Sequence, residues 1–347
     1  MKSAFITGIT GQDGSYLTEL LLSNGYQVYG LMRRKSEYTT SRIDHLLNNP
    51  NVKILYGDIT DASTLDDIIA TYHPNEIYNL AAQSFVGESW KEPVYTCNVD
   101  GMGVLNLLES IRKIDKSIKF YQASTSEMYG TVKEIPQNEQ TPFNPNSPYA
   151  AAKVFAYYLT KVYRESYNMF ACNGILFNHE SSRRGTEFVT RKITMAVAKI
   201  KQQLTNNETV IPLSLGNIYT RRDWGYAGDY VNAMYLMLQQ DKPDDFVIAS
   251  GESHTVKEFI NLAFKFANID IQWVNTIDKP SLDEYAIDSK TGNKIVTINK
   301  DYFRLNDVPL LVGDPSKAKQ ILNWKTTVNF EALVKMMVEF DLSLIQR

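Results

Sequence analysis

The sequence predicts an α/β protein with a Rossmann-type, doubly wound parallel sheet and a smaller second α/β domain. In the first half, short β-branched or aromatic runs alternate with longer segments of helical period, which is the pattern of βαβ units around a parallel sheet. A glycine-rich turn follows the first of these runs. After about Phe177 the alternation becomes less regular, which indicates a second and smaller domain.

Six strands are predicted in the first half, and helices connect them. The predicted strands are Ala4–Thr7, Gln27–Leu31, Val52–Tyr56, Glu76–Leu80, Lys119–Ser124 and Gly174–Phe177. The predicted helices are Ser15–Ser23, Ala62–Thr71, Val94–Arg112 and Pro148–Ser166. Gly25 and Pro74 act as helix stops. In such a sheet, ligands are expected at the carboxyl ends of the strands.

The second half combines fewer strands with longer helices. The predicted elements are helix Glu187–Gln203, strand Val210–Leu215, helix Asp229–Gln239, strand Phe246–Ala249, helix Val256–Ala267 and helix Phe330–Leu344. The polar, turn-rich stretch 275–299 is expected to form an insertion loop or a ribbon. We therefore expect a dinucleotide-binding domain over 1–178, with segments near 215–250 returning to it. The smaller domain would take about 179–214 and 251–347.

Composition excludes several classes of protein. The 347 residues carry 36 Lys and Arg against 39 Asp and Glu, so there is no global basic field to attract nucleic acid or an anionic membrane. The two cysteines, Cys97 and Cys172, cannot build a disulfide framework or a cysteine zinc site, and the four histidines lack metal-ligand spacing. No apolar run reaches the roughly 20 residues of a membrane span or resembles a signal-peptide core. A reducing, cytoplasmic setting without a metal cofactor is expected.

The turn after the first predicted strand has glycines at spacing three and three. Such glycines allow the backbone to approach a pyrophosphate, and the following helix offers free N–H groups with a partial positive charge. The position between strand and helix favours a dinucleotide site over a simple tight turn. The residues expected to contact the cofactor here are Gly8, Thr10, Gly11, Gln12, Asp13 and Gly14.

The end of the second predicted strand indicates which dinucleotide is bound. An acidic residue there would bind the ribose 2′-hydroxyl of NAD, but this chain has Arg33, Arg34 and Lys35 instead. A solvated basic turn is the alternative, but three cations beside a dinucleotide turn favour a 2′-phosphate, and hence NADP. Asp58 and Ile59, after the third strand, would flank the adenine.

A phenol and an ammonium group share one helix face in the fourth predicted helix. Tyr149 and Lys153 stand at i and i+4, and Thr125 lies at the carboxyl end of the fifth strand. A nearby ammonium group lowers the pKa of a phenol and so makes it a better base. Thr125 can bond the same substrate oxygen. Together with the glycine turn, this set is typical of hydride-transfer enzymes.

These motifs resemble the extended short-chain dehydrogenase/reductase family, in its sugar-nucleotide-modifying group. Glu127 narrows the resemblance, because simple epimerases of the group usually lack a glutamate two positions after the strand-end hydroxyl, whereas 4,6-dehydratases have one. Dehydratases acting on dTDP-glucose typically read Thr-Asp-Glu, and this chain reads Thr125-Ser126-Glu127. The resemblance thus implies that one carboxylate, Glu127, acts as both base and acid.

The closest resemblance is to the 4,6-dehydratases that act on GDP-mannose, and it extends over essentially the whole chain. The matching segments are 8–16 with 20–22, 33–34, 42–45, 120–129, 147–153, 173–180, 188–194 and 222–225. Ser182 departs from a usual proline, and Leu305 and Asp307 depart from the family pattern around Arg304.

The resemblance implies an internal hydride transfer through bound NADP that converts GDP-mannose to GDP-4-dehydro-6-deoxy-D-mannose and water, the first step toward GDP-deoxyhexoses such as GDP-fucose or GDP-rhamnose. It makes Thr125, Glu127, Tyr149 and Lys153 catalytic. It adds as cofactor contacts Leu80, Ala82, Ser84, Tyr95, His179 and Arg184. It assigns to the substrate Ser84, Ser126, Glu127, Asn178, Glu187, Val189, Lys192, Gly216, Arg222 and Arg304.

Three alternatives stay open at this stage. A nucleotide-sugar epimerase or reductase would use Thr125, Tyr149 and Lys153 without needing Glu127. A catalytically silent NADP-binding protein could share the fold. A dehydratase could also reduce its own 4-keto product. The resemblance further implies a homodimer or homotetramer, with the basic turn 33–42 reaching a neighbouring subunit.

Overall fold

The computed structural model describes residues 1–34, 36, 39–277, 279–303, 308 and 310–345, and the chain forms two compact units. The first unit comprises Met1–Phe177, Ala227–Ala249 and Gly313–Thr326, and the second comprises Asn178–Tyr226, Ser250–Val312 and Thr327–Arg347. The sequence prediction placed all of 251–347 in the smaller domain, whereas Gly313–Thr326 returns to the first unit. No helix in the described part of the chain is long and apolar enough to cross a membrane.

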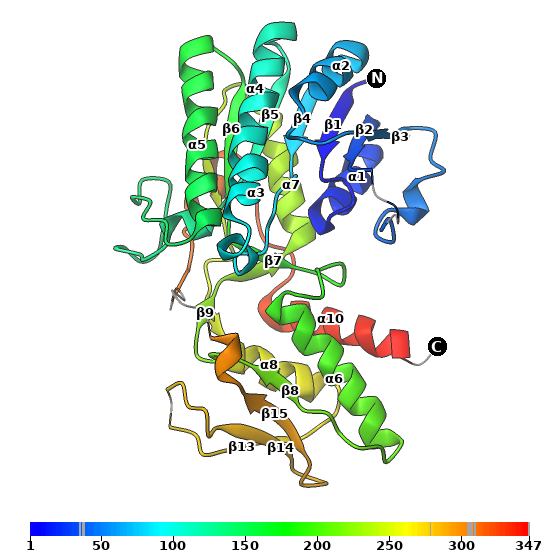
Figure 1. The fold of residues 1–347 in the computed structure, drawn as a ribbon, viewed down its shortest axis with the longest axis vertical. Coiled ribbons are helices and arrows are strands. Elements are labelled where there is room, and N and C mark those ends of the chain that lie inside the picture. The colour runs from blue at the N-terminus through cyan, green and yellow to red at the C-terminus, as the bar shows by residue number, and fades with distance from the viewer. Residues whose placement is uncertain (35, 37–38, 278, 304–307, 309, 346–347) are drawn as a thin grey trace. The chain divides into compact units, whose positions relative to one another are not determined.

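The first unit is built on a seven-stranded sheet whose neighbouring strands all run parallel (Figure 1). Its strand order is β11-β6-β5-β4-β1-β2-β3. The strands are β1 Ser3–Thr7, β2 Gln27–Met32, β3 Val52–Tyr56, β4 Glu76–Asn79, β5 Lys119–Thr125, β6 Ala171–Leu176 and β11 Phe246–Ile248. The order reverses between β1 and β4, which is the switch point where doubly wound sheets bind ligands. The predicted fold class is confirmed.

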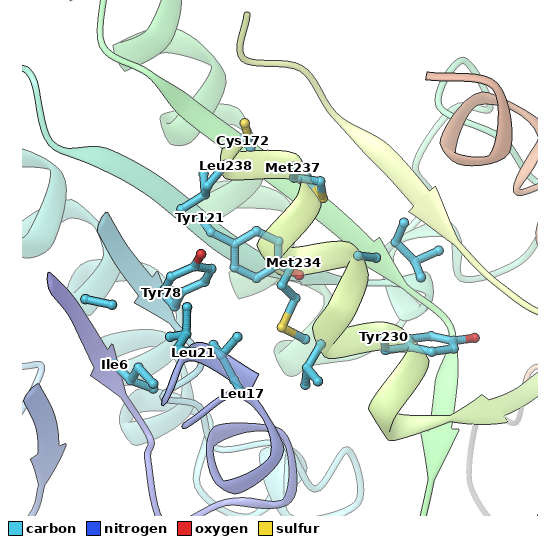
Figure 2. Close-up of a cluster of buried hydrophobic side chains, with 14 of the residues drawn as sticks. Ile6, Leu17, Leu21, Tyr78, Tyr121, Cys172, Tyr230, Met234, Met237 and Leu238 are labelled. Atoms are coloured by element: carbon cyan, nitrogen blue, oxygen red, sulfur yellow. The ribbon is translucent and has the colours of Figure 1, made fainter. Parts of the chain in front are cut away.

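Helices cover both faces of this sheet. On one face α1 (Gln12–Ser23) packs against α7 (Ala227–Leu238), and on the other α4 (Gly103–Ile114) packs between α2 (Ala62–Tyr72) and α5 (Pro148–Tyr167). Figure 2 shows the first of these cores, in which Leu17 and Leu21 of α1 face Met234 of α7 over the sheet residues Tyr78 and Tyr121. Near-continuous apolar strands suit a sheet that is buried on both faces.

The single helix predicted over 94–112 is three consecutive pieces in the structure. Helix α3 covers Pro93–Cys97, a π turn (η3) covers Asn98–Met102, and α4 begins at Gly103. A π turn inserts an extra residue into a helix and is frequent at functional sites. Periodicity alone could not reveal it, because the flanking turns keep the helical pattern.

The second unit has a four-stranded mixed sheet of order β13-β14-β15-β8. Its strands are β8 Leu213–Leu215, β13 Ile271–Val274, β14 Tyr285–Asp288 and β15 Lys294–Ile298. Helices α6 (Val189–Thr205), α8 (Val256–Phe266) and α10 (Phe330–Ile345) supply its core. The ribbon expected in 275–299 is therefore part of a sheet.

The short elements of the described chain lie in both units. They are β7 Asn178–Glu180, β9 Arg221–Arg222, β10 Trp224–Tyr226, β12 His254–Thr255, α9 Ser316–Ile321 and the single turns Asp44–Leu46, Glu88–Trp90, Ser126–Tyr129 and Lys300–Tyr302.

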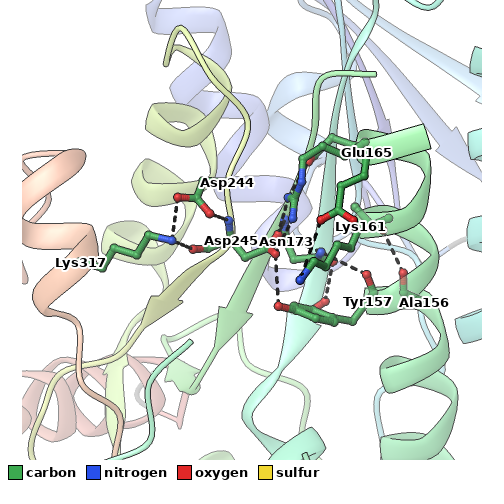
Figure 3. Close-up of polar contacts among 12 residues, drawn as sticks. Ala156, Tyr157, Lys161, Glu165, Asn173, Asp244, Asp245 and Lys317 are labelled. Atoms are coloured by element: carbon green, nitrogen blue, oxygen red, sulfur yellow. Dashed lines mark hydrogen bonds and ion pairs between the residues drawn. The ribbon is translucent and has the colours of Figure 1, made fainter. Parts of the chain in front are cut away.

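A buried carboxylate joins α5, β6 and the approach to β11 (Figure 3). Asp245 accepts two bonds from the Arg164 guanidinium, at 2.7 and 2.8 Å, and two from the backbone and side-chain nitrogens of Asn173, both at 3.0 Å. The Tyr157 hydroxyl donates to the second oxygen at 3.2 Å. Burial raises the pKa of the Asp245 carboxyl, but the bonds from Arg164 and Asn173 outweigh burial and bring the pKa below its ordinary value.

Asp245→Ala should destabilise the first unit by about 3–5 kcal/mol, because it leaves the Arg164 charge buried without its partner. Urea denaturation followed by circular dichroism would measure the loss. The folded carboxyl has the lower pKa, so its stabilisation is present at neutral pH. The difference between wild type and variant should therefore shrink below about pH 4.

The neighbouring Asp244 provides a matched control, because its 2.7 Å ion pair with Lys317 is partly exposed. Asp244→Ala should cost less than about 1 kcal/mol. Equal effects of the two substitutions would contradict the importance assigned to the buried pair.

Candidate active site

The glycine turn between β1 and α1 lies directly against the backbone that follows β4. Gly8 has φ of +73°, and a Cβ built on it would stand 2.9 Å from the Leu80 carbonyl and the Ala81 nitrogen. The Gly11 amide donates to the Gly8 carbonyl at 3.0 Å, and Gly11 is the N-cap of α1. A Cβ on Gly14 would collide with the Gly8 carbonyl and Ile9. The turn is thus a backbone cradle at the N-terminus of a helix, which is the arrangement that a pyrophosphate site requires.

Other predicted cofactor residues surround this turn. The Thr10 carbonyl accepts a hydrogen bond from the Arg42 guanidinium at 3.4 Å. Gln12 and Asp13 form the first turn of α1, where their side chains are bonded at 3.1 Å. Leu80, Ala82 and Ser84 follow β4, and exposure increases from half-buried Leu80 to exposed Ser84.

A buried polar ladder crosses the sheet at the switch point. The Thr7 hydroxyl donates to the Asn79 side-chain oxygen at 2.6 Å and accepts the Leu80 and Ala81 amides, both at 3.1 Å. The Asn79 amide donates in turn to the Gln122 side chain at 2.7 Å. The ladder therefore ties the carboxyl ends of β1 and β4 to the middle of β5. Sequence reasoning missed these residues, although polar side chains within or at the ends of three apolar strands were a usable signal.

The basic end of β2 lines a pocket of about 470 Å³. Its lining is Arg33, Arg34, Tyr56, Gly57 and Asp58. The Arg34 guanidinium lies 4.6 Å from the Tyr56 ring centre, and the Arg33 guanidinium donates to the Tyr95 hydroxyl. The Asp58 carboxylate accepts the Thr60 amide at 2.9 Å. The pocket therefore combines two exposed cations with an aromatic face, which suits a purine ring and a phosphate.

Ile59, predicted to flank the adenine, is only 3% exposed. It packs at the beginning of α4, where a Cβ on Gly103 would meet its side chain at 2.9 Å. Its carbonyl accepts the Asn106 side chain at 3.1 Å.

The end of β5 presents the predicted hydroxyl and carboxylate together. Thr125 ends the strand and caps the turn Ser126–Tyr129 by accepting the Glu127 amide at 3.2 Å. Thr125 and Glu127 are half-buried, whereas Ser126 is only 2% exposed. A capped single turn therefore holds Glu127 close to Thr125 at the ligand-binding edge of the sheet.

Helix α5 begins beside this strand end with a well-defined cap. Ser147 accepts the Ala150 amide at 3.1 Å and Pro148 occupies the first turn, so Tyr149 stands at the start of the helix. Lys153 is 3% exposed and donates to the Ala123 carbonyl of β5 at 3.1 Å. Its ammonium nitrogen lies 5.8 Å from the centre of the Tyr149 ring. One turn of helix thus presents both groups beside β5.

The second unit carries the other predicted site residues. Asn178 and His179 lie on β7, and the Asn178 side-chain oxygen is buried with no hydrogen-bond partner among the described residues. Arg184 is ion-paired with buried Glu180 at 3.0 Å and lies 3.6 Å from the Phe188 ring centre. A buried, unpartnered amide oxygen is costly unless a ligand satisfies it.

The predicted phosphate contacts differ in their existing partners. Arg222 donates to the carbonyls of Arg221 and Val308 at 2.9 and 2.6 Å. Lys192 has no carboxylate partner among the described residues, and its nitrogen lies 3.7 Å from the Tyr302 ring centre. Burial lowers the pKa of Lys192. Arg304 lies outside the described residues.

Three further substrate predictions fall on the same unit. Glu187 is exposed and Val189 is half-buried at the start of α6. Gly216 has a packing reason of its own, because a Cβ there would collide with the backbone of Tyr302.

The parallel sheet, the glycine cradle and the pairing of a strand-end hydroxyl with a Tyr-x-x-x-Lys helix define a short-chain dehydrogenase/reductase. Within that class, the sequence profile of the family described as GDP-mannose 4,6 dehydratase matches residues 5–337. The chain belongs to the GDP-mannose 4,6-dehydratase family.

Curated relatives carry the same similarity over nearly the full chain. A GDP-mannose 4,6-dehydratase of Yersinia enterocolitica is 52% identical across 99% of this chain and 94% of its own length. One of Homo sapiens is also 52% identical, across 99% of this chain and 92% of its own. Among solved structures, a dTDP-glucose 4,6-dehydratase of Bacillus anthracis in complex with NAD superimposes with a TM-score of 0.78 at 19% identity, covering 98% of this chain and 96% of that one. That last similarity shows the fold.

Gly8→Ala should disrupt the turn for two reasons. The alanine would have to adopt a positive φ, and its methyl group would press on the Leu80–Ala81 backbone. We expect a loss of more than about 1 kcal/mol in urea denaturation and a loss of dinucleotide binding by calorimetry. Gly25 has φ of +76°, but a Cβ added there would meet nothing within 4 Å, so Gly25→Ala isolates the cost of the backbone conformation. Equal losses in the two variants would contradict the close approach at Gly8.

Proposed function

We propose that this enzyme converts GDP-D-mannose to GDP-4-dehydro-6-deoxy-D-mannose and water, with NADP as a recycled cofactor. The observation that carries the proposal is Glu127 held two residues beyond Thr125, in the turn that Thr125 caps, at the end of the strand that Lys153 of α5 also contacts, in a chain of this family. An epimerase or a simple reductase would not need that carboxylate.

The residues present fit a nicotinamide dinucleotide. The backbone cradle of Gly8, Gly11 and Gly14 has no room for side chains and opens a helix N-terminus, as a pyrophosphate requires. When bound, the nicotinamide ring supplies a hydride acceptor for carbon 4 and a hydride donor for carbon 6, with no net change over the cycle. Tyr149, Lys153, His179 and Arg184 are proposed to lie at that end of the cofactor.

NADP is favoured over NAD by the charges at the end of β2. Arg33 and Arg34 line the pocket beside Tyr56, and both are exposed to a ligand there. Asp58, the carboxylate that lines the same pocket, already accepts bonds from Thr60. A 2′-phosphate would therefore meet two guanidinium groups.

Tyr149 is proposed to take the proton of the sugar 4-hydroxyl as carbon 4 is oxidised. The Lys153 ammonium favours the phenolate, and Thr125 can bond the same oxygen. The 4-keto group that results makes the hydrogen on carbon 5 acidic. This division of labour requires the phenol and hydroxyl to face one oxygen, which their positions on α5 and at the end of β5 support.

Glu127 is proposed to remove the carbon 5 proton and then to protonate the departing 6-hydroxyl, so that the carbon–oxygen bond breaks and water leaves. Ser126, which stands where related dehydratases acting on dTDP-glucose have an acid, has no proton-transfer role of this kind. Because Glu127 gives its proton to the leaving water, it is a carboxylate again when the elimination is complete. It is then proposed to take a proton from solvent and deliver it to carbon 5.

The nucleotide diphosphate is proposed to bind the cations of the second unit. Lys192 suits this role because its charge has no carboxylate partner among the described residues. Ser84, Asn178, Glu187, Val189, Gly216, Arg222 and Arg304 are proposed to complete the substrate site. The unpartnered Asn178 oxygen supports a polar ligand there.

The enzyme is further proposed to act in the cytoplasm as a homodimer or homotetramer. Both cysteines are free, which is compatible with a reducing compartment. Phe155, Tyr158 and Val162 of α5 are 45%, 51% and 49% exposed and share one helix face, which supports burial against a second copy.

The test of this function is an incubation with GDP-mannose and a trace of NADP⁺ in deuterated water, followed by mass spectrometry. The expected product has lost one water and gained one solvent deuteron, with no net reduction of the cofactor. Unchanged GDP-mannose together with turnover of another sugar nucleotide would contradict the proposal and favour an epimerase or reductase.

Glu127→Gln should lower turnover by about 10²-fold or more in the same assay, because the amide can neither accept the carbon 5 proton nor donate one. Cofactor affinity, measured by fluorescence titration, should stay unchanged. Glu165→Gln on the exposed face of α5 makes the same chemical change and should leave turnover intact. Normal turnover in Glu127→Gln would remove the role of this residue.

Arg33→Ala should weaken NADP binding by about 10- to 100-fold and leave NAD binding nearly unchanged, because it removes a charged bond to the 2′-phosphate alone. Lys53→Ala removes an exposed cation from the neighbouring strand β3 and serves as the control. An equal loss for both dinucleotides would show that Arg33 does not discriminate between them.

A further inference from the structure

A fully buried carboxylate, Asp100, stands in the π turn between α3 and α4, and the mechanism above does not use it. Asp100 has no solvent exposure. The turn packs against α5, where a Cβ on the adjacent Gly101 would lie 3.0 Å from the Phe155 ring and 3.8 Å from the Ala152 carbonyl. The inserted residue of the π turn thus brings Asp100 to the part of α5 that carries Lys153.

The hydrogen bonds of Asp100 are incomplete. One carboxylate oxygen accepts the Gln83 amide at 2.7 Å, and the other is buried with no hydrogen-bond partner among the described residues. An unsatisfied buried carboxylate oxygen costs stability, and a structural residue would be expected to have both oxygens bonded. A nearby positive charge would compensate for the missing hydrogen bond to this oxygen.

The opposite charge on the segment of α5 that packs against the π turn belongs to Lys153, which is buried as well. Burial lowers the pKa of the Lys153 ammonium group, and the Asp100 carboxylate opposes that effect. Burial raises the pKa of Asp100 to about 6, against the opposing influences of Lys153 and the Gln83 amide. The hydrogen bond from Lys153 to the Ala123 carbonyl satisfies a donor but adds no opposite charge.

Other titratable groups on the elements around the turn have partners elsewhere or lie in solvent. On α3, Tyr95 bonds Arg33 and Cys97 is exposed. On α4, Glu109 is committed to Arg112 and Tyr163. On α5, Tyr149 and Lys153 are the titratable groups in the first two turns.

We propose that Asp100 is a positioning residue that keeps the buried Lys153 protonated, and so sets the pH range in which Tyr149 works as a base. The inference deepens the proposed function and rests on it for the role of Tyr149. Without the carboxylate, burial would remove the lysine proton at lower pH. A neutral lysine no longer favours the phenolate, so Tyr149 would need a more alkaline solution to lose its proton.

The first test measures Lys153 itself and needs no substrate. Asp100→Asn and Asp100→Ser remove the charge while still offering an acceptor to the Gln83 amide. NMR titration of isotope-labelled lysine, with the Lys153 signal assigned by its loss in Lys153→Arg, should show the Lys153 pKa lower in both variants by about one unit or more. An unchanged titration would overturn the inference whether or not GDP-mannose is the substrate.

The second test is the pH profile of turnover. Turnover rises with pH as Tyr149 loses its proton, and this rise should move to higher pH by about one unit or more in both variants. On the acidic side of the rise, turnover should be about tenfold lower than in wild type. The KM for GDP-mannose should stay within about twofold of wild type. In a Lys153→Arg background the guanidinium stays charged unaided, so adding Asp100→Asn should no longer move the profile.

Asp241→Asn, which removes an exposed charge after α7, is the matched control and should leave both readouts unchanged. A shift to lower pH, or an equal shift in the lysine and arginine backgrounds, would mean that Asp100 acts on Tyr149 directly and would overturn the inference. Failure of both variants to fold would assign Asp100 a structural role and would overturn it as well. Failure of wild type to dehydrate GDP-mannose would instead contradict the proposed function.

Discussion

The active-site architecture depends on how β1 is held to β4 at the point where the strand order reverses. Thr7 bonds the amides of Leu80 and Ala81 as well as the Asn79 side chain, and the backbone of Gly8 lies against the same segment. At a switch point the connections from adjacent strands leave on opposite faces and open a crevice. Because the glycine has no side chain, the crevice floor is backbone, which lets a phosphate approach the N-terminus of α1 closely.

The second constraint is electrostatic, because the helix that delivers the tyrosine also buries a lysine. Lys153 reaches Ala123 of β5 with almost no exposure, so its solvation is lost on folding. A charge buried in this way is retained only where an opposite charge or several hydrogen bonds compensate it. The π turn that carries Asp100 is thus linked to the chemistry through electrostatics rather than through contact with a ligand.

Cations elsewhere in the chain divide into two groups by their partners, one paired with buried carboxylates and one lying against aromatic rings. Arg164 and Arg191 are committed to the buried carboxylates Asp245 and Asp341, each at 2.7 Å, and these pairs hold elements of their own unit together. Arg33 and Lys192 lie against aromatic rings instead. Counting arginines and lysines in the sequence could not separate the two groups, because the difference is the position of a carboxylate distant in sequence.

The sequence by itself determined the fold class and most elements, because strand and helix periodicities, the glycine spacing and the helix caps are local features. Strand β3 matches its predicted bounds, and the proposed roles of Thr125, Glu127, Tyr149 and Lys153 come from short motifs. Only the tertiary structure decided that 94–112 contains a π turn, that Gly313–Thr326 returns to the first unit, and that Asp100 is buried where the π turn packs against α5, the helix of Lys153. Those features arise from contacts between segments far apart in the chain, and burial, which sets the energies of charges, exists only once those segments have packed.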